Sequence, residues 1–360
     1  LQGDWSSDVC SSDLESYPLQ IAARGSDTRW VEKSIATKID PLGRNIESKD
    51  ALGNYGAELY GYNHSLVIAT ATNARHNEIA YDGFEDYNYS NQVTNPFSRC
   101  PLPVHFKPTE FSALSKDTSH TGLHSLPVER GTFVTRTYAA QADRPLALTN
   151  RSTYQADASV VISPFSPTRG KKFFISTWVL KPTQSSSTTS SNTTNTLQQI
   201  SQSVLPGRGL IPGIGGTGAL PGITGSSGDF DLIVHSRNDA GVTSTIGRFK
   251  AEGNSIDGWQ LVSGEFTVPN DAASVTIEMR ANRSKVWFDD LRVQPFNSVM
   301  KTFVYHPLSL RLMATMDENN YATYYVYDSN EQLIATKKET EDGILTVQEA
   351  RYGTSKITKP

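Results

Sequence analysis

From about Glu78 to Gln294, short runs of β-forming residues alternate with turn residues, and patterns with the period of a helix are scarce. Short runs bounded by turn signals are typical of strands. A series of such runs without helices between them predicts an all-β fold, a jelly-roll β-sandwich. The predicted strands are Gly131–Thr137, Ser159–Ser163, Lys172–Leu180, Phe230–Ser236, Ser244–Phe249, Trp259–Val268, Ser274–Arg280 and Lys285–Val293.

The charge balance limits the classes of partner. The chain has 33 Lys and Arg residues against 37 Asp and Glu residues, and no basic run. This balance argues against a nucleic-acid partner held by bulk charge. No apolar stretch approaches the roughly 20 residues that span a bilayer, so we expect no membrane span in this fragment.

The first residues look foreign to the rest of the chain. Residues 4–14 read DWSSDVCSSDL, which resembles, letter for letter, the translation of a common sequencing-adapter primer. We therefore interpret residues 1–14 as an artefact and expect a fragment at both ends, so a missing signal peptide says nothing about secretion. Cys10 would then be foreign, which leaves Cys100. Two cysteines are in any case too few for a disulfide framework or a thiolate metal site.

A low-complexity stretch interrupts the predicted sandwich at residues 184–228. It is rich in Ser and Thr and then in Gly and Pro, so it cannot bury enough apolar surface to offset its ordering entropy, and we expect a disordered loop. Gly213, Gly215 and Gly218 spell G-x-G-x-x-G within it. A dinucleotide site needs that motif between a strand and a helix, and this context is absent from the sequence.

Residues 15–77 and 298–360 share a turn-then-strand rhythm. Asp40–Gly43 has the pattern D-x-x-G, and it recurs ten residues later as Asp50–Gly53. Asp accepts hydrogen bonds from the backbone ahead of it, and Gly tolerates positive φ, so the pattern suits a tight turn. Both segments therefore predict β-hairpin arrays.

The C-terminal segment resembles the tyrosine-aspartate (YD) repeat of the Rhs family, Y-x-Y-D-x-x-G-R-L. The stretch 322–337 reads ATYYVYDSNEQLIATK, in which Glu331 and Gln332 stand where Gly and Arg are usual. The matching residues are Tyr325, Tyr327, Asp328 and Leu333. The resemblance implies repeats that build long β-sheets and perform no chemistry themselves.

Five landmarks occur in order along the central unit. They are Asp82–Asp86, Ser119–Leu126, Phe173–Val179, Trp259–Pro269 and Trp287–Val293. The set resembles the galactose-binding-like jelly rolls of carbohydrate-binding modules of families four and nine. We therefore divide the chain into the artefact (1–14), a first repeat segment (15–77), the sandwich (78–297) and a second repeat segment (298–360).

The same resemblance implies a structural calcium ion that ties the first strand to the last. Glu85, Gly122 and Asp290 would be its ligands, with Asp289 or Asp82 as alternates. Calcium takes six to eight oxygen ligands and mixes carboxylates with backbone carbonyls. The alternative interpretation is that these acids are solvated turn residues, because members of a fold family can lose a site and keep the fold.

Carbohydrate-binding modules stack sugar rings on exposed aromatic side chains. Trp178, Trp259 and Trp287 lie in landmark strands, where core packing is the favoured interpretation over a binding platform. Looser candidates on expected loops are Tyr81, Tyr87, Tyr89 and Tyr138. The sequence singles out no ligand-binding residue.

No catalytic constellation emerges from the sequence. His120 and His124 have the spacing of a helical metal face, but Gly122 and Pro127 argue against a helix there. Asp289 and Asp290 are adjacent on an expected strand, so they should point to opposite faces and make a poor acid–base pair.

We therefore predict a non-catalytic structural or binding module of a large bacterial Rhs-like protein, at the cell surface or secreted. Its expected partners are the rest of the parent polypeptide and a polysaccharide or glycan. The alternative is a piece of the β shell of a polymorphic toxin whose toxin domain lies beyond Pro360.

Overall fold

A computed structural model of the protein describes residues 33–40, 43–62, 65–87, 113–141, 165–182, 228–251 and 253–350. Within these ranges the chain forms eighteen strands and one short 3-10 helix, so the all-β prediction is confirmed. The artefact segment 1–14, the run Ser159–Ser163, Tyr89 and nearly all of the loop 184–228 lie outside the described residues. The described residues contain no helix with the length and apolar character needed to span a membrane.

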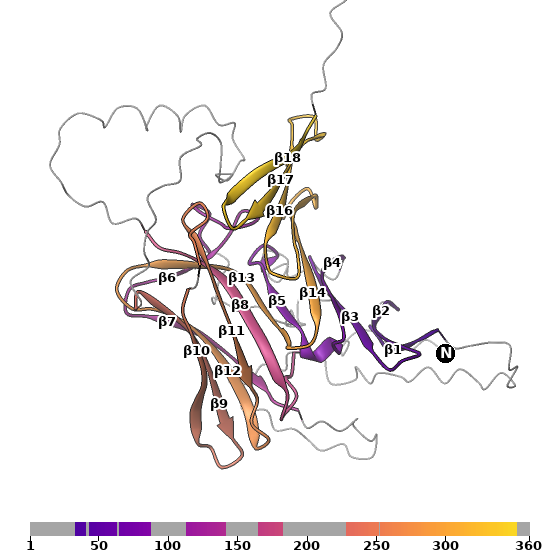
Figure 1. Cartoon of the computed structure of the whole chain (residues 1–360), viewed down its shortest axis with the longest axis vertical. Coiled ribbons are helices and arrows are strands. Elements are labelled where there is room, and N and C mark those ends of the chain that lie inside the picture. The colour runs from indigo at the N-terminus through magenta and orange to yellow at the C-terminus, as the bar shows by residue number, and fades with distance from the viewer. Residues whose placement is uncertain are drawn as a thin grey trace, which may run out of the picture.

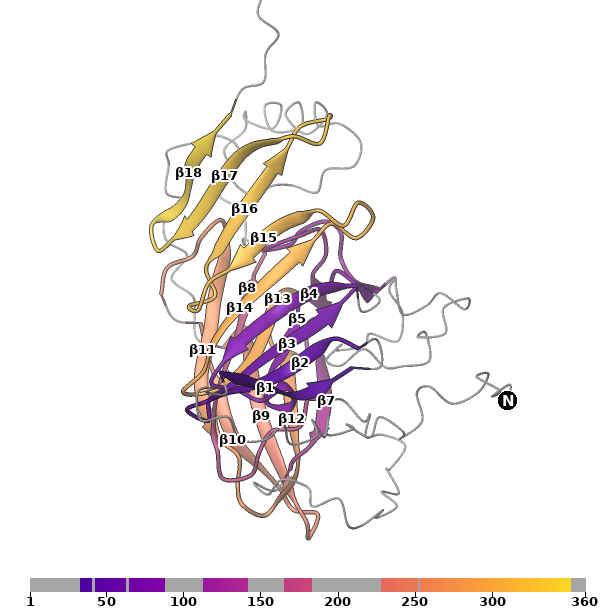
Figure 2. The same ribbon diagram turned by 90° about the vertical axis from the view of Figure 1, so that its right-hand side faces the viewer.

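One antiparallel sheet of nine strands runs along one side of the molecule (Figure 2). Its strands follow one another in chain order, except where β4 pairs directly with β14. The strands, in sheet order, are β1 (Ser34–Ile39), β2 (Asn45–Asp50), β3 (Tyr55–Gly61), β4 (Leu66–Thr72), β14 (Val299–Tyr305), β15 (Leu312–Met316), β16 (Ala322–Tyr327), β17 (Leu333–Thr340) and β18 (Gly343–Glu349). The chain therefore leaves this long sheet after β4 and returns to the neighbouring position as β14.

Between these two strands the chain forms a β-sandwich (Figure 1). One sheet has the order β10-β9-β12-β7, and the other has the order β11-β8-β13-β5, with β6 also paired to β13. The strands are β5 (Ala80–Asp82), β6 (Leu126–Val128), β7 (Phe133–Ala139), β8 (Lys172–Leu180), β9 (Phe230–Asn238), β10 (Thr243–Phe249), β11 (Trp259–Thr267), β12 (Ala272–Ala281) and β13 (Val286–Pro295). The two sheets pack through alternate apolar side chains, such as Ile175 on β8 and Val234 on β9, which are fully buried.

Seven described strands of the sandwich, β7 to β13, match predicted runs closely, whereas no run was predicted at β5 or β6. Strand β8 has the predicted limits, Lys172–Leu180. Strand β7 starts at Phe133, two residues later than predicted, because Gly131 has φ +75° and its N–H donates to Ala281 O. A residue in this left-handed conformation belongs to a turn.

The D-x-x-G turns form as predicted. Gly43 and Gly53 have φ of +81° and +92°. Their N–H groups donate to the carbonyls of Asp40 and Asp50, at 2.9 and 3.0 Å. Each of these Asp side chains also accepts a backbone N–H from the residues ahead. At the similar turn Asp328–Glu331, Glu331 takes the place of Gly and has φ +70°.

The Glu331 turn yields a stability prediction. A side chain in the left-handed region costs about 1 kcal/mol more than Gly does. The ion pair of Glu331 with Arg311 is largely exposed and offsets little of this cost. We therefore expect Glu331→Gly to raise the free energy of unfolding by up to about 1 kcal/mol in denaturant titrations. A loss of stability would contradict this account of the turn.

A short 3-10 helix, η1 (His76–Glu78), connects the long sheet to the sandwich. The backbone N–H of His76 donates to Glu47 Oε2 at 2.8 Å, and its ring Nδ1 lies 2.8 Å from Glu58 O. A carbonyl only accepts, so Nδ1 carries the proton in this contact. Burial, aided by Lys38, lowers the pKa of His76 from 6.5 to about 4.

This lowered pKa predicts a loss of stability in acid. As the pH falls from 6.5 toward 4, the unfolded chain protonates His76 before the folded chain does. At pH 4.5 the lowered pKa of His76 should reduce the free energy of unfolding by about 2–3 kcal/mol, a figure already reduced because the side chain is partly exposed. We expect His76→Gln to abolish this pH-dependent loss. Denaturant titrations of both proteins from pH 7 to pH 4.5 measure this difference. A difference that does not change with pH would rule the effect out.

Candidate functional site

The site that links the two parts of the molecule lies where the long sheet covers the outer face of the β11-β8-β13-β5 sheet; we call this contact the seam. Trp178 on β8 is 1% exposed although it points away from the core of the sandwich. Its Nε1 donates to Asn320 O at 2.9 Å, and its ring meets Tyr321 edge-on at 6.0 Å. The turn between β15 and β16 thus packs on the outer face of the β11-β8-β13-β5 sheet.

Arg292 on β13 forms the second anchor of the seam. It is 1% exposed, and its guanidinium donates to Asp317 O at 2.7 Å and Glu318 O at 3.0 Å. Burial lowers the pKa of Arg292 to about 10, and the nearby Tyr81 and acidic groups oppose that shift. A buried guanidinium that lost these two hydrogen bonds would be costly. The two bonds therefore tie the turn between β15 and β16 to the sandwich.

A loop, residues 119–125, closes one end of the seam, and four buried carboxylates hold it; we call this arrangement the clasp. Glu85 Oε1 accepts the backbone N–H groups of Leu123 and His124 at 2.5 and 2.6 Å, and Oε2 lies 2.8 Å from His124 Nδ1. Asp289 Oδ2 accepts the N–H of His120 at 2.7 Å. Burial and the charge of Asp290 raise the pKa of Asp289 well above its usual range.

His120 lies at the centre of the clasp. Its Nδ1 is 2.7 Å from Asp290 Oδ2, and its Nε2 is 3.0 Å from Glu339 Oε1 on β17. The imidazole stacks on the Trp178 indole, with ring centroids 4.2 Å apart. Burial lowers the pKa of His120, but Glu339 and Asp290 outweigh it and raise the pKa to about 9.

The two adjacent aspartates of β13 do not point to opposite faces, so that expectation is wrong. A β-bulge interrupts the pairing with β8 between Asp289 and Arg292, and Asp290 adopts φ +51° within it. The extra residue of a bulge redirects side chains. Both carboxylates therefore reach the same loop, where Asp290 accepts the Thr121 hydroxyl at 2.9 Å.

The three expected calcium ligands do come together in the clasp. A Cβ added to Gly122 would collide with the Glu85 carboxylate, and the neighbouring Thr121 binds Asp290. However, N–H and O–H groups point at the carboxylate oxygens that an ion would need, and Gly122 O already accepts the Ser119 hydroxyl. In the described part of the chain no group of three or more His, Cys, Asp or Glu side chains is placed to hold a metal. The alternate Asp82 accepts Phe84 N–H and the Tyr87 hydroxyl. As arranged, these residues do not fit calcium.

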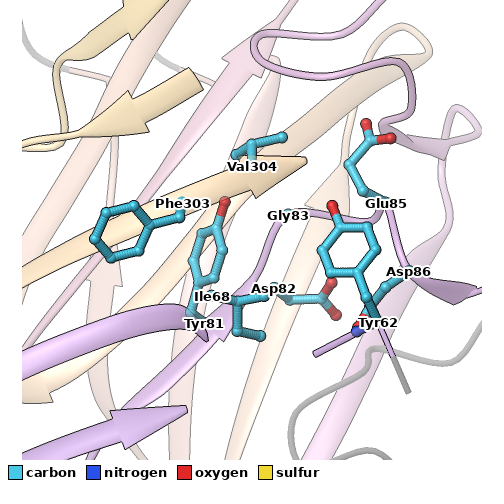
Figure 3. A pocket seen from close by; sticks show the side chains of 9 residues that line it. All are labelled: Tyr62, Ile68, Tyr81, Asp82, Gly83, Glu85, Asp86, Phe303 and Val304. Carbon is cyan, nitrogen blue, oxygen red and sulfur yellow. The ribbon is translucent and has the colours of Figure 1, made fainter. Parts of the chain in front are cut away.

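A small cavity lies beside the clasp, between the long sheet and the first strand of the sandwich (Figure 3). Its volume is about 10 Å³, room for a single water molecule. Tyr62, Tyr81, Asp82 and Glu85 contribute polar groups to its wall. A sugar ring does not fit this space.

The aromatic candidates divide by burial. Trp178 and Trp259 are buried, but they pack at the seam and not in the core of the sandwich where the packing interpretation placed them, whereas Trp287 is half-buried. Three of the tyrosines are buried and offer no platform; they are Tyr81, Tyr87 and Tyr138. The largest exposed aromatic surfaces among the described residues belong to Phe133 and Phe296, at 51% and 43%.

No known protein-family profile and no curated protein sequence matches this chain. Among solved structures, it is similar to the CBM22-1 xylan-binding domain of Paenibacillus barcinonensis Xyn10C, with 12% identity and a TM-score of 0.25 over 51% of this chain and 78% of that one. It is also similar to the C-terminal family 22 carbohydrate-binding module of Clostridium thermocellum Xyn10B, with 14% identity and a TM-score of 0.26 over 51% and 80%. These low values assign neither a function nor a ligand to the chain.

Proposed function

We propose that this chain is a non-catalytic structural and binding module of a large secreted or cell-surface bacterial Rhs-like protein. One observation carries the proposal: the sandwich is inserted between β4 and β14, which are neighbouring strands of one continuous sheet. The long sheet thus acts as a scaffold that presents the sandwich. The partner of the scaffold is the rest of the parent polypeptide.

The scaffold role also fits the regular order of the long sheet. Each strand on either side of the insertion pairs with the strand that precedes or follows it in the chain. Such a meander extends by adding hairpins, and each hairpin needs only its neighbour to pair with. The same strand order is also compatible with the alternative role, a piece of a toxin shell. An uninterrupted gene that encodes a toxin domain after the repeats would favour that alternative.

The binding role of the sandwich rests on its second outer face, formed by β10-β9-β12-β7. A polar row crosses all four strands, with Thr137 and Thr276 hydroxyls 2.8 Å apart and Thr245 Oγ1 3.1 Å from His235 Nδ1. On the edge strand β7 of this sheet, the exposed Phe133 ring lies 4.6 Å from the Arg280 guanidinium. Hydroxyls, charged groups and an aromatic ring together suit a polyhydroxylated ligand, so we propose that this face binds a glycan.

A polysaccharide-binding assay on the purified chain tests this part of the proposal. We expect retention by at least one insoluble or immobilised polysaccharide, and about a tenfold or greater loss of affinity in Phe133→Ala, because a stacking ring contributes about 1–2 kcal/mol. Phe296→Ala is the matched control, since that ring is exposed elsewhere, next to Lys172. No binding across a broad panel would reject the glycan role and leave the scaffold role standing.

A further inference from the structure

Four buried carboxylates meet around the loop 119–125, and their charges require compensation. Glu85, Asp289, Asp290 and Glu339 are each at most 3% exposed. Carboxylates in a poorly solvated site repel one another and either take up protons or gather cations. The resemblance to carbohydrate-binding modules implied calcium as that cation, but the arrangement of donors points elsewhere.

We propose that the His120 imidazolium, not a metal ion, is the cation of the clasp, and that it locks the long sheet onto the sandwich. Each ring nitrogen of His120 lies within hydrogen-bond distance of a carboxylate, Asp290 on one side and Glu339 on the other. Ionised carboxylates accept hydrogen bonds and do not donate them. In this proposal both carboxylates are ionised, so both ring nitrogens carry protons and the ring is positively charged.

The surroundings of His120 fit a buried cation. The indole of Trp178 stacks against the imidazole at an interplanar angle of 15°, and Trp259 meets it edge-on at 5.7 Å. An indole face attracts a cation, most strongly where water is excluded. The Tyr324 hydroxyl donates to His120 O at 3.2 Å and so fixes the backbone of the same residue.

The remaining carboxylate oxygens are also occupied by protein donors. Asp290 Oδ1 accepts the Tyr81 hydroxyl at 2.9 Å, and Glu339 Oε2 accepts Ala322 N–H at 2.9 Å. A calcium ion would need six to eight oxygens turned toward it, and it would displace these N–H and O–H groups. These protein donors, together with those of the loop, thus take the place of the ion.

The position of Glu339 gives the clasp its role. Asp290 belongs to β13, the last strand of the sandwich, whereas Glu339 belongs to β17 of the long sheet. His120 bridges the two across 170 and 219 positions of sequence. It is therefore a positioning residue that joins the scaffold to the domain it presents.

Calcium-dependent melting of the whole unmodified chain tests the metal-free clasp first. We expect the Tm to stay unchanged when calcium is added or when a chelator removes traces of it, because the described residues of the clasp offer the ion no site. A clear rise of Tm with calcium, reversed by the chelator, would overturn the proposal and support the calcium site.

Nitrogen-15 NMR of the His120 ring tests the charge itself, without any substitution. We expect both ring nitrogens of His120 to appear protonated at neutral pH. A neutral ring, with one nitrogen unprotonated, would overturn the proposal. This measurement is independent of glycan binding, so its failure and the failure of the proposed function are distinguishable.

Substitution then measures the strength of the bridge. We expect His120→Gln to lower the Tm by about 5–10 °C, the effect of breaking a buried ion pair in a chain of this size. His235→Gln is the matched control, because His235 is 24% exposed and lies 3.5 Å from Glu278. In a double-mutant cycle, His120→Gln and Glu339→Gln should be strongly non-additive. Additive effects would show that the two residues do not form the proposed bridge.

Discussion

Replacing Trp178 by alanine is expected to lower the free energy of unfolding by about 3–5 kcal/mol. The indole is almost completely buried at the seam, where it stacks on His120 and donates to Asn320 O. Its removal leaves a cavity and an unpaired carbonyl at once. Denaturant titration of the whole chain measures the loss.

Trp178→Phe separates the two contributions of this residue. Phenylalanine keeps an aromatic face for His120 but has no donor for Asn320 O. We expect it to recover more than half of the stability lost in Trp178→Ala. If both variants unfolded like the unmodified chain, Trp178 would not be the packing centre of the seam.

Arg292→Met should cost about 3–4 kcal/mol, the second largest effect that we expect. Methionine fills part of the volume of the arginine side chain, but it leaves the carbonyls of Asp317 and Glu318 without their donor. Those carbonyls lie in the turn that covers β13, so the turn should become the first part of the long sheet to open.

The matched control for Arg292→Met is Arg280→Met. Arg280 is 35% exposed on the opposite sheet of the sandwich, where it pairs with Glu278. Partly exposed ion pairs contribute little, so we expect a change below about 1 kcal/mol there. Equal losses at the two positions would contradict the special role of the seam.

Local sequence signals predicted much of the fold. Alternating apolar residues and flanking turns placed β8 correctly and β9 to β13 within a few residues. The D-x-x-G turns were predictable because an Asp side chain and a Gly with positive φ interact only with their immediate neighbours. Strand β5 also pairs with β13, as expected of the first and last strands of the sandwich.

The seam and the clasp could not be predicted in the same way. The pairing of β4 with β14 and the bond from His120 to Glu339 both join residues more than 200 positions apart. The β-bulge at Asp290 leaves no recognisable pattern in the sequence. The two aspartates were therefore expected to alternate between opposite faces, as in a regular strand. His120 was marked only by its place in a landmark and by its spacing from His124, and neither feature indicated Glu339 as a partner.

We expect the long sheet and the sandwich to unfold as one unit, because the seam joins them. Native-state hydrogen exchange of the whole chain tests it most directly. We expect backbone amides of β15–β17 and of β8 to open with the same free energy, and we expect Trp178→Ala to lower the opening free energy of both. Rapid exchange in β15–β17 while β8 stays fully protected would contradict it.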